Sequence, residues 1–303
     1  MSLCEVVAIC KDPDLANKKN LILQVCVWRN NMCCIFGIGL FNNHGIESAS
    51  ALTGVISRLF KEAESGGRLA AGLSIMREKT AHVLRRPISA SELVGSSEYM
   101  DFMHENLKPT DESNKLMSII GHCRWPTQGP PENNLNNHPQ VIDNIIGVHN
   151  GVISNDHELF KSFEKVITRK AMVDTEIIFQ LIKHFNKSEN SRTVDAIEKT
   201  TGYLVGGYAC AMQNTKHPYN LYLFKRGNPI TVMRYPKAGI IMFGTRASFM
   251  KSAYEDFVEG TGSGKEVDMK DKQGLVFNLW NHTICRFDFK DNNDIKELDH
   301  NAG

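Results

Sequence analysis

The pattern of apolar and polar positions predicts a mixture of short strands and two amphipathic helices. Strands are predicted where apolar residues run together or alternate with polar ones between turn signals. The segments are 33–40, 203–212, 219–226, 239–244, 275–280 and 283–287. Segment 141–154 is predicted to hold two more strands joined at Asn150-Gly151, because Asn-Gly between apolar runs is the strongest local hairpin signal.

Two segments carry apolar residues at helical spacing. The first, 46–64, ends at Gly66-Gly67, and the second begins after Asp174, whose side chain can cap the helix. The buried stripes are predicted to be Leu52, Val55, Ile56, Leu59 and Phe60 in the first helix and Ile177, Ile178, Leu181, Ile182 and Phe185 in the second. Antiparallel strand pairs interrupted by two such helices favour an α+β layered fold.

Composition and charge exclude several classes of protein. The chain has 303 residues, 42% of them hydrophobic, so it can bury a sizeable core as one large domain or two small ones. Its net charge of +1 gives no global field for nucleic acid or an anionic membrane, so neither is expected as a partner. Its apolar stretches are shorter than the roughly 20 residues of a membrane span, and its start lacks a secretory signal. Eight cysteines without a CxxC pair favour reduced thiols in the cytoplasm.

The densest polar signal lies in the middle of the chain. Four motifs follow one another there: Gly-His-Cys-Arg-Trp-Pro-Thr-Gln-Gly at 121–129, Asn-Asn-His-Pro at 136–139, Val-His-Asn-Gly-Val-Ile-Ser-Asn at 148–155 and Asp-Thr-Glu at 174–176. Each motif alone has an ordinary structural interpretation, as a turn, a helix cap or a surface cation–π pair. Cys33 and Cys34 alone would be inert core thiols. Only the joint occurrence of the motifs in this order favours a functional site.

Together with Cys33-x-Ile35-x-Gly37, these motifs resemble those of class II glutamine amidotransferases, which are N-terminal-nucleophile hydrolases. The resemblance is closest to the glutaminase domain of glucosamine-6-phosphate synthase, and it covers roughly residues 33–249. It implies an αββα four-layer sandwich with two stacked antiparallel sheets. Residues 33–303 are then expected to form an amidotransferase domain, and residues 1–32 an N-terminal extension.

The resemblance implies hydrolysis of L-glutamine to glutamate and ammonia through a cysteine thioester. Cys33 would supply the thiolate, and its own α-amine, which titrates near pH 7 to 8, would serve as the general base. The side-chain amide of Asn150 and the backbone N–H of Gly151 would stabilise the oxyanion. This chemistry requires no cofactor and no metal ion.

The resemblance also implies how the substrate is held. Arg124 can bind the α-carboxylate of glutamine with its two-pronged guanidinium, and Asp174 can accept from the α-ammonium. Trp125 and Thr127 would line the pocket. His138 would lie in the loop that frames it.

The chain departs from the family at three places. Cys34 stands where the family usually has Gly, and segment 66–72 replaces the family's Arg-Gly-x-Asp-Ser-Ala-Gly. Residues 1–32 are the third departure, because they keep the nitrogen of Cys33 in an amide, which is not a base. They are either a propeptide or lie upstream of a true start at Met32, which is favoured because unprocessed relatives begin with Met before the nucleophile.

Two other functions follow from features outside that resemblance. If residues 1–32 stay attached, the chain fits a non-catalytic glutamine-binding regulatory subunit. A nucleotide-binding protein would require a phosphate loop at 260–265, but Glu259 and Glu266 stand where Gly and Ser or Thr are needed.

Relatives fuse this domain to a synthase that consumes ammonia, and only about 50 residues follow Phe249, fewer than a typical domain. The acceptor of ammonia is therefore expected to be a separate synthase subunit that aminates a sugar phosphate or a nucleobase precursor.

Overall fold

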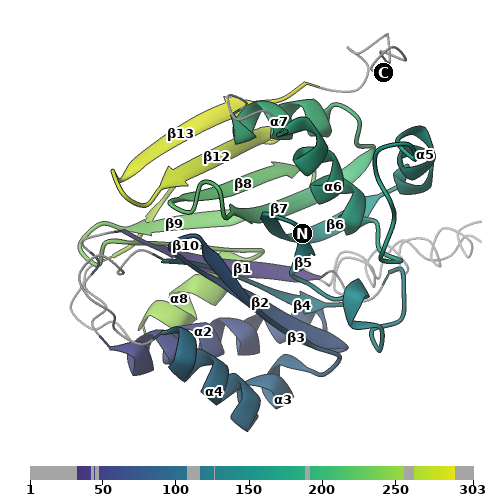
Figure 1. Cartoon of the computed structure of the whole chain (residues 1–303). Coiled ribbons are helices and arrows are strands. Elements are labelled where there is room, and N and C mark those ends of the chain that lie inside the picture. The colour runs from purple at the N-terminus through teal and green to yellow at the C-terminus, as the bar shows by residue number, and fades with distance from the viewer. Residues whose placement is uncertain are drawn as a thin grey trace, which may run out of the picture.

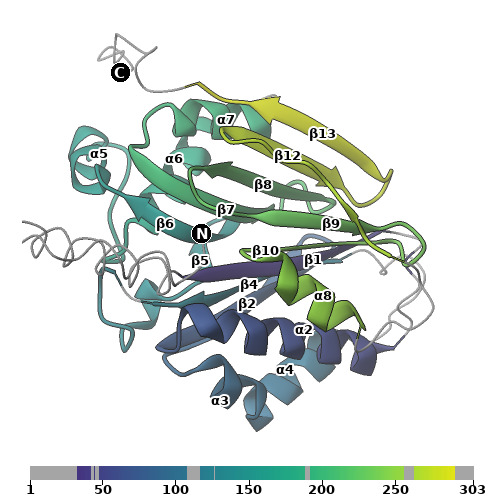
Figure 2. The same ribbon diagram turned by 180° about the vertical axis from the view of Figure 1, so that it is seen from behind.

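Two antiparallel sheets stack face to face in the middle of the molecule, and helices cover the outer face of each (Figure 1). The computed structural model describes residues 33–41, 44, 48–107, 117–125, 127–187, 192–255 and 263–290. The same four layers are visible from behind (Figure 2). The predicted αββα sandwich with two stacked antiparallel sheets is therefore confirmed. The extension 1–32, the start at Met32 and the tail after residue 290 lie outside the described residues.

The first sheet holds seven strands in the order β11-β9-β10-β1-β4-β2-β3. Their bounds are β1 Cys34–Leu40, β2 Ala70–Arg77, β3 Thr80–Arg86, β4 Met117–Arg124, β9 Thr231–Tyr235, β10 Ile240–Gly244 and β11 Lys265–Glu266. β1 lies between β10 and β4, and all of its residues are buried. A strand covered on both faces reads as a continuous apolar run, and this explains why the sequence signal of β1 was clear.

The second sheet holds six strands in the order β13-β12-β8-β7-β6-β5. Their bounds are β5 Gln140–Ile142, β6 Ile145–Ile153, β7 Gly206–Asn214, β8 Asn220–Arg226, β12 Gln273–Asn278 and β13 Thr283–Asp288. The predicted hairpins of β7 with β8 and of β12 with β13 are present. β1 and β4 of the first sheet pack against β6 of the second.

Helices α2 Ala49–Ala63, α3 Ala90–Val94, α4 Ser97–Asn106 and α8 Ala247–Glu255 lie on the first sheet, and α6 Thr175–Phe185 and α7 Thr193–Thr201 on the second (Figures 1 and 2). α5 Asp156–Ser162 lies at the edge of the second sheet. The predicted stripes of α2 and α6 are buried, apart from the half-buried Phe185. Within the described part of the chain, no helix is both long and apolar enough to cross a membrane.

Three apolar layers separate the four layers of structure. The first lies between α2 and the first sheet, the second between the two sheets, and the third between the second sheet and α6. Side chains alternate along β1, so that Cys34 and Phe36 lie in the first layer whereas Ile35 lies in the second. This alternation decides which of two adjacent cysteines faces the middle of the molecule.

The predicted hairpin turn at Asn150-Gly151 is wrong. Asn150 and Gly151 lie inside β6, opposite Ala209 and Tyr208 of β7. The turn between β5 and β6 falls at residues 143–144, where Asp143 adopts φ +59°. Asp tolerates this left-handed conformation better than most residues, and therefore the turn could form without glycine.

Helix α6 begins where it was predicted, and Asp174 occupies its N-cap position. The prediction that the Asp174 side chain caps the helix is wrong, because this side chain makes no capping hydrogen bond. Strands β2, β3, β4 and β9 were not predicted. The predicted loop 260–274 lies partly outside the described residues, and its remainder contains β11 and the first two residues of β12.

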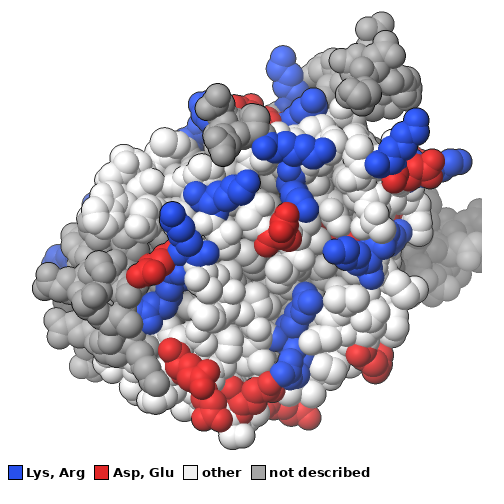
Figure 3. All heavy atoms as spheres, viewed as in Figure 1, with Lys and Arg blue, Asp and Glu red and all other residues white. Residues whose placement is uncertain are grey.

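Basic and acidic side chains are interspersed over the face of the molecule shown in Figure 3. Acidic side chains gather over α3 and α4. On α4 they include Glu98, Asp101 and Glu105, which line a polar hollow beside Arg86 of β3. Glu98 is paired with Arg86, so part of this negative charge is neutralised locally.

Candidate active site

Cys33 directly precedes β1, and its thiol lies against the main chain that follows β4. Its Sγ donates to the carbonyl oxygen of Trp125 at 3.1 Å and accepts from the Trp125 N–H at 3.2 Å. Cys33 shares the strand alternation of Ile35, which lies between the sheets, while Cys34 packs beneath α2. Of the two adjacent thiols, therefore, only that of Cys33 has the direction needed to reach the space between the sheets.

Two opposite charges act on the Cys33 thiol. Burial raises the pKa of Cys33 to about 12, the Trp125 N–H and the Arg124 guanidinium lower that pKa, and Cys34 and Asp174 raise it. Arg124 and Asp174 are thus within electrostatic reach of Sγ. A thiol with this pKa is protonated at neutral pH and requires a nearby base before it can act as a nucleophile.

Arg124 ends β4 and is buried. Its Nη1 donates to Oδ1 of Asn137 at 3.0 Å, and its Nη2 donates to the carbonyl oxygens of Gly129, at 2.7 Å, and of Gln128. These bonds fix the guanidinium in the loop between β4 and β5. Within the described part of the chain they use three of its five N–H groups, and so Nε and one hydrogen of Nη1 remain for an anion.

Asp174 connects the start of α6 to the end of β6. Its Oδ2 accepts from the backbone N–H of Ile153 at 2.7 Å, and the residue is almost fully buried. A carboxylate has about four acceptor positions, so this bond, the one it makes to the residues that the structure describes, leaves most of its capacity for a cationic group. The carboxylate is therefore held in place by β6 rather than by its own helix.

Asn150 lies in the middle of the second sheet's β6 with its side chain buried. Its Nδ2 is buried and finds no hydrogen-bond acceptor among the described residues. Nδ2 of Asn228 donates to the carbonyl oxygen of Asn150 at 2.9 Å, and this bond helps to hold the backbone of β6 in place. A buried amide donor held in place without a partner has the property that an oxyanion donor needs.

Gly151 adopts φ +148°, a backbone conformation that only glycine adopts readily. A Cβ built at this position would lie 2.0 Å from the carbonyl oxygen of Gly207 in β7 and 2.8 Å from Nε2 of His149. No side chain therefore fits here. The Asn-Gly pair predicted a turn because glycine permits a positive φ. In the structure this positive φ occurs inside strand β6.

The other three residues predicted to form the pocket, Trp125, Thr127 and His138, differ in how far they are buried. Trp125 contacts Cys33 through its main chain, and its side chain is 40% exposed. Thr127 is exposed, and Pro126 between them lies outside the described residues. His138, which was expected to lie in the loop that frames the pocket, is buried, and its ring stacks on His122 with centroids 4.0 Å apart. Its assignment to substrate binding stays a prediction.

Relatives with curated names match this chain over part of its length. Glutamine–fructose-6-phosphate aminotransferase (isomerizing) of Lactococcus lactis is 37% identical over 114 residues, which are 37% of this chain and 19% of that protein. The protein of the same name from Bacillus licheniformis is 26% identical over 247 residues, 81% of this chain and 37% of that protein. No protein-family model matches the sequence.

Solved structures share the fold. Glutamine phosphoribosylpyrophosphate amidotransferase from B. subtilis matches with a TM-score of 0.60 and 17% identity, over 85% of this chain and 49% of that one. An allosteric regulatory enzyme of purine biosynthesis matches with a TM-score of 0.58 and 15% identity, over the same shares of the two chains. These sequence matches and the shared fold are consistent with a class II glutamine amidotransferase domain. The chain spans less than half the length of each of these four proteins.

Two asparagines support the candidate site although no role was predicted for them. Oδ1 of Asn136 accepts from the Met172 N–H at 2.8 Å, while Oδ1 of Asn137 accepts from Arg124. Their Nδ2 atoms donate to carbonyl oxygens of the loop between β4 and β5. The sequence could have indicated this role, because two adjacent asparagines in a polar loop are typical of side chains that bond to the loop backbone.

Segment 66–72, which departs from the family pattern, lies against Arg124. A Cβ on Gly67 would be 2.2 Å from the carbonyl carbon of Arg124, and the Leu69 N–H donates to its carbonyl oxygen at 3.3 Å. Ala70 then pairs with Arg124 as β2 begins. Although its sequence departs from the family pattern, this segment still supports the backbone of a residue expected to bind substrate.

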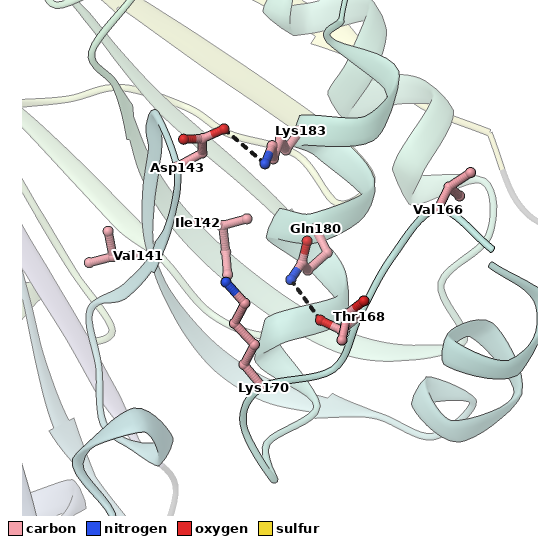
Figure 4. A pocket seen from close by; sticks show the side chains of 8 residues that line it. All are labelled: Val141, Ile142, Asp143, Val166, Thr168, Lys170, Gln180 and Lys183. Carbon is pink, nitrogen blue, oxygen red and sulfur yellow. Dashed lines mark hydrogen bonds and ion pairs between the residues drawn. The ribbon is translucent and has the colours of Figure 1, made fainter. Parts of the chain in front are cut away.

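A separate pocket of about 260 Å³ lies between the β5–β6 turn, the 166–170 loop and α6 (Figure 4). Lys183 is paired with Asp143 at 2.8 Å, and Nε2 of Gln180 donates to the carbonyl oxygen of Thr168 at 3.3 Å. None of the predicted catalytic or substrate-binding residues lines this pocket.

Proposed function

We propose that the amidotransferase domain hydrolyses L-glutamine to glutamate and ammonia, with Cys33 as the nucleophile. The observation that carries the proposal is that the Cys33 thiol bonds the main chain of Trp125, next to Arg124, where Arg124 and Asp174 shift the pKa of the thiol in opposite directions. A free amino acid carries one charge of each sign beside its reacting side chain. A cation and an anion around one thiol match that substrate class.

The nucleophile requires the α-amine of Cys33 to be free. The amine takes the thiol proton, the thiolate attacks the side-chain amide carbon of glutamine, and negative charge develops on the amide oxygen. The orphan Nδ2 of Asn150 and the Gly151 N–H are assigned to that oxygen. When the intermediate collapses, the protonated amine returns its proton to the leaving ammonia, and a thioester remains. Water then attacks the thioester, glutamate leaves, and the Cys33 thiol is restored.

Substrate recognition is assigned to the unused hydrogen-bonding capacity of two fixed side chains. Arg124 would bind the α-carboxylate through an N–H group that the loop does not occupy, and Asp174 would accept from the α-ammonium through its remaining acceptor positions. Both groups are already held by other parts of the protein, so binding glutamine would order little that is not ordered beforehand. Trp125 and Thr127 are assigned to the rim of the pocket, and His138 to the loop behind it.

A non-catalytic glutamine-binding subunit is the second candidate function. The raised pKa of Cys33 favours it, because a thiol that stays protonated cannot attack an amide. The two candidates differ in the fate of residues 1–32. Intact-mass measurement on the native protein distinguishes them: a mature chain that starts at Cys33 supports the hydrolase, and a retained Met1 supports the silent subunit.

The acceptor of ammonia is proposed to be a separate synthase subunit. The relatives named above are an aminotransferase for fructose-6-phosphate and an amidotransferase for phosphoribosylpyrophosphate, which leaves a phosphorylated sugar as the common acceptor class. Five cysteines of the described part are free thiols, a state that fits the reducing cytoplasm. Release of ammonia and glutamate from glutamine, before and after removal of residues 1–32, tests the activity without the acceptor.

A further inference from the structure

A buried hydroxyl at the start of α6 joins three segments of the candidate site. Thr175 is the first residue of α6, and its Oγ1 lies 2.9 Å from Nε2 of His138 and 3.0 Å from Nδ1 of His149. All three side chains are buried. A hydroxyl has one hydrogen and two acceptor positions, and therefore it can satisfy one ring nitrogen as donor and the other as acceptor.

Each of the three residues is adjacent in sequence to a residue of the proposed machinery. Thr175 follows Asp174, and His149 precedes Asn150. His138 follows Asn137, which accepts from Arg124. The hydroxyl of Thr175 therefore connects the two groups that would bind the charged ends of glutamine with the strand that carries the oxyanion donors.

The two histidine rings depend on this hydroxyl. Nδ1 of His138 and Nε2 of His149 are buried and have no hydrogen-bond partner within the described part of the chain. Among the described residues, the bond to Thr175 is thus the one hydrogen bond that each of these two rings makes, and it sets which ring nitrogen faces the Thr175 hydroxyl. Burial lowers the pKa of both rings, which keeps them neutral and suited to a network of single donors and acceptors.

The ring of His149 also lies beneath the proposed oxyanion site. A Cβ on Gly151 would come within 2.8 Å of His149 Nε2, so the ring abuts the glycine whose N–H is assigned to the oxyanion. Nε2 of His122 donates to the carbonyl oxygen of His149 at 3.1 Å, and the ring of His122 stacks on that of His138. The network thus extends from β4 of the first sheet to β6 of the second.

We propose that Thr175 is a positioning residue for glutamine hydrolysis, whose hydroxyl holds His138 and His149 so that Asp174 and the Asn150-Gly151 donors keep their relative placement. The inference rests on the function proposed above. Loss of the hydroxyl removes the bond that both rings share, and β6 and the start of α6 are then free to shift against each other. Binding and chemistry should be impaired together, because Asp174 acts on the substrate in both states and Asn150 acts in the transition state.

The chain offers a matched control. Thr193 is also a buried first residue of a helix, α7, and its hydroxyl accepts from Nδ2 of Asn186 at 3.3 Å and from Nδ2 of Asn214 at 3.2 Å. Thr193→Val removes a hydroxyl that is similarly buried and has at least as many polar partners, because the Tyr222 hydroxyl also bonds it. It differs from Thr175→Val in lying outside the candidate site.

The test compares wild type, Thr175→Val, Thr175→Ser and Thr193→Val after release of the Cys33 amine, by glutamate formation and by urea unfolding. Thr175→Val should lower kcat and raise KM, with kcat/KM reduced about tenfold or more, the scale of one lost buried hydrogen bond. Thr175→Ser should stay within about threefold of wild type. Thr193→Val should shift the unfolding midpoint as Thr175→Val does and leave both kinetic constants unchanged.

Equal kinetics for Thr175→Val and Thr193→Val would overturn the inference, and so would a Thr175→Ser as impaired as Thr175→Val. If Thr175→Val does not fold, His138→Phe replaces it, since this variant keeps a ring to stack on His122 and removes the nitrogen that faces Thr175. An unchanged kcat/KM in His138→Phe would equally refute the inference. Failure of the proposed function is distinguishable, because wild type and Thr193→Val would then release no glutamate either.

Discussion

The orphan amide of Asn150 allows catalysis and stability to be separated by one substitution. Asn150→Ala removes a buried donor that has no partner among the described residues, and such an unpaired donor destabilises a folded protein by about 1–3 kcal/mol. The substitution also removes packed atoms, with an opposing effect of similar size. The free energy of unfolding should therefore stay within about 1 kcal/mol of wild type. Loss of an oxyanion donor should lower kcat by about 10²- to 10³-fold with KM nearly unchanged.

Asn136→Ala is the matched control for that experiment. Asn136 is buried like Asn150, but its side chain bonds Pro130 and Met172. Its removal leaves a backbone N–H and a carbonyl without partners, at a cost of about 1–3 kcal/mol for each that stays buried. Urea unfolding and steady-state glutamate release on both variants check the contrast. A change confined to KM in Asn150→Ala, or a stability loss equal to that of Asn136→Ala, would show that the Asn150 amide is an ordinary structural group.

Three further predictions concern binding, the nucleophile and pH. Arg124→Ala and Asp174→Ala should each raise KM for glutamine steeply, because loss of one partner of a desolvated charge pair costs about 2–5 kcal/mol; an effect on kcat alone would contradict the assignment. A glutamine-analogue diazo ketone should label Cys33, whereas Cys34→Gly should retain activity; tryptic peptides labelled at Cys34 would reverse the two roles. Burial lowers the pKa of His122 to about 3, so the unfolded state binds its proton first as pH falls. Stability should thus fall below about pH 6.5 and continue to fall toward pH 3, by up to about 1.4 kcal/mol per pH unit for this ring. Urea midpoints that stay constant between pH 7 and pH 5 would refute the buried neutral ring.

The sequence by itself predicted the strand that is buried on both faces and the helices whose buried residues recur at a regular spacing. β1 was predicted because a strand covered on both faces is apolar throughout, and α2 and α6 were predicted because a single buried face repeats every three to four residues. Strands β2 to β4 contain arginine, serine and histidine beside apolar residues, so no simple period was visible. Their polar side chains are satisfied by partners distant in sequence, such as Gln213 for Ser74.

Local signals also predicted the wrong local structure where the fold supplied another partner. Asn150-Gly151 has the composition of a turn, but β7 provides a complete ladder of pairing, and the glycine is needed because Gly207 approaches it too closely for a Cβ. Asp174 has the composition of an N-cap, but its carboxylate accepts from Ile153 instead. In both cases a long-range hydrogen bond replaced the short-range one that the sequence favoured.

The motifs named most of the candidate site residues, and only the tertiary structure decided how they relate. Strand alternation and the stacking of two sheets separate Cys33 from Cys34 and bring Arg124 and Asp174 to one thiol. Asn137 bonds Arg124 across 13 residues of sequence, and the Thr175 hydroxyl bonds His138 across 37 residues. A sequence pattern records which residue types are present at which spacing. Which of them share a buried space is determined by packing between layers, because those contacts join parts of the chain that have no local relation to each other.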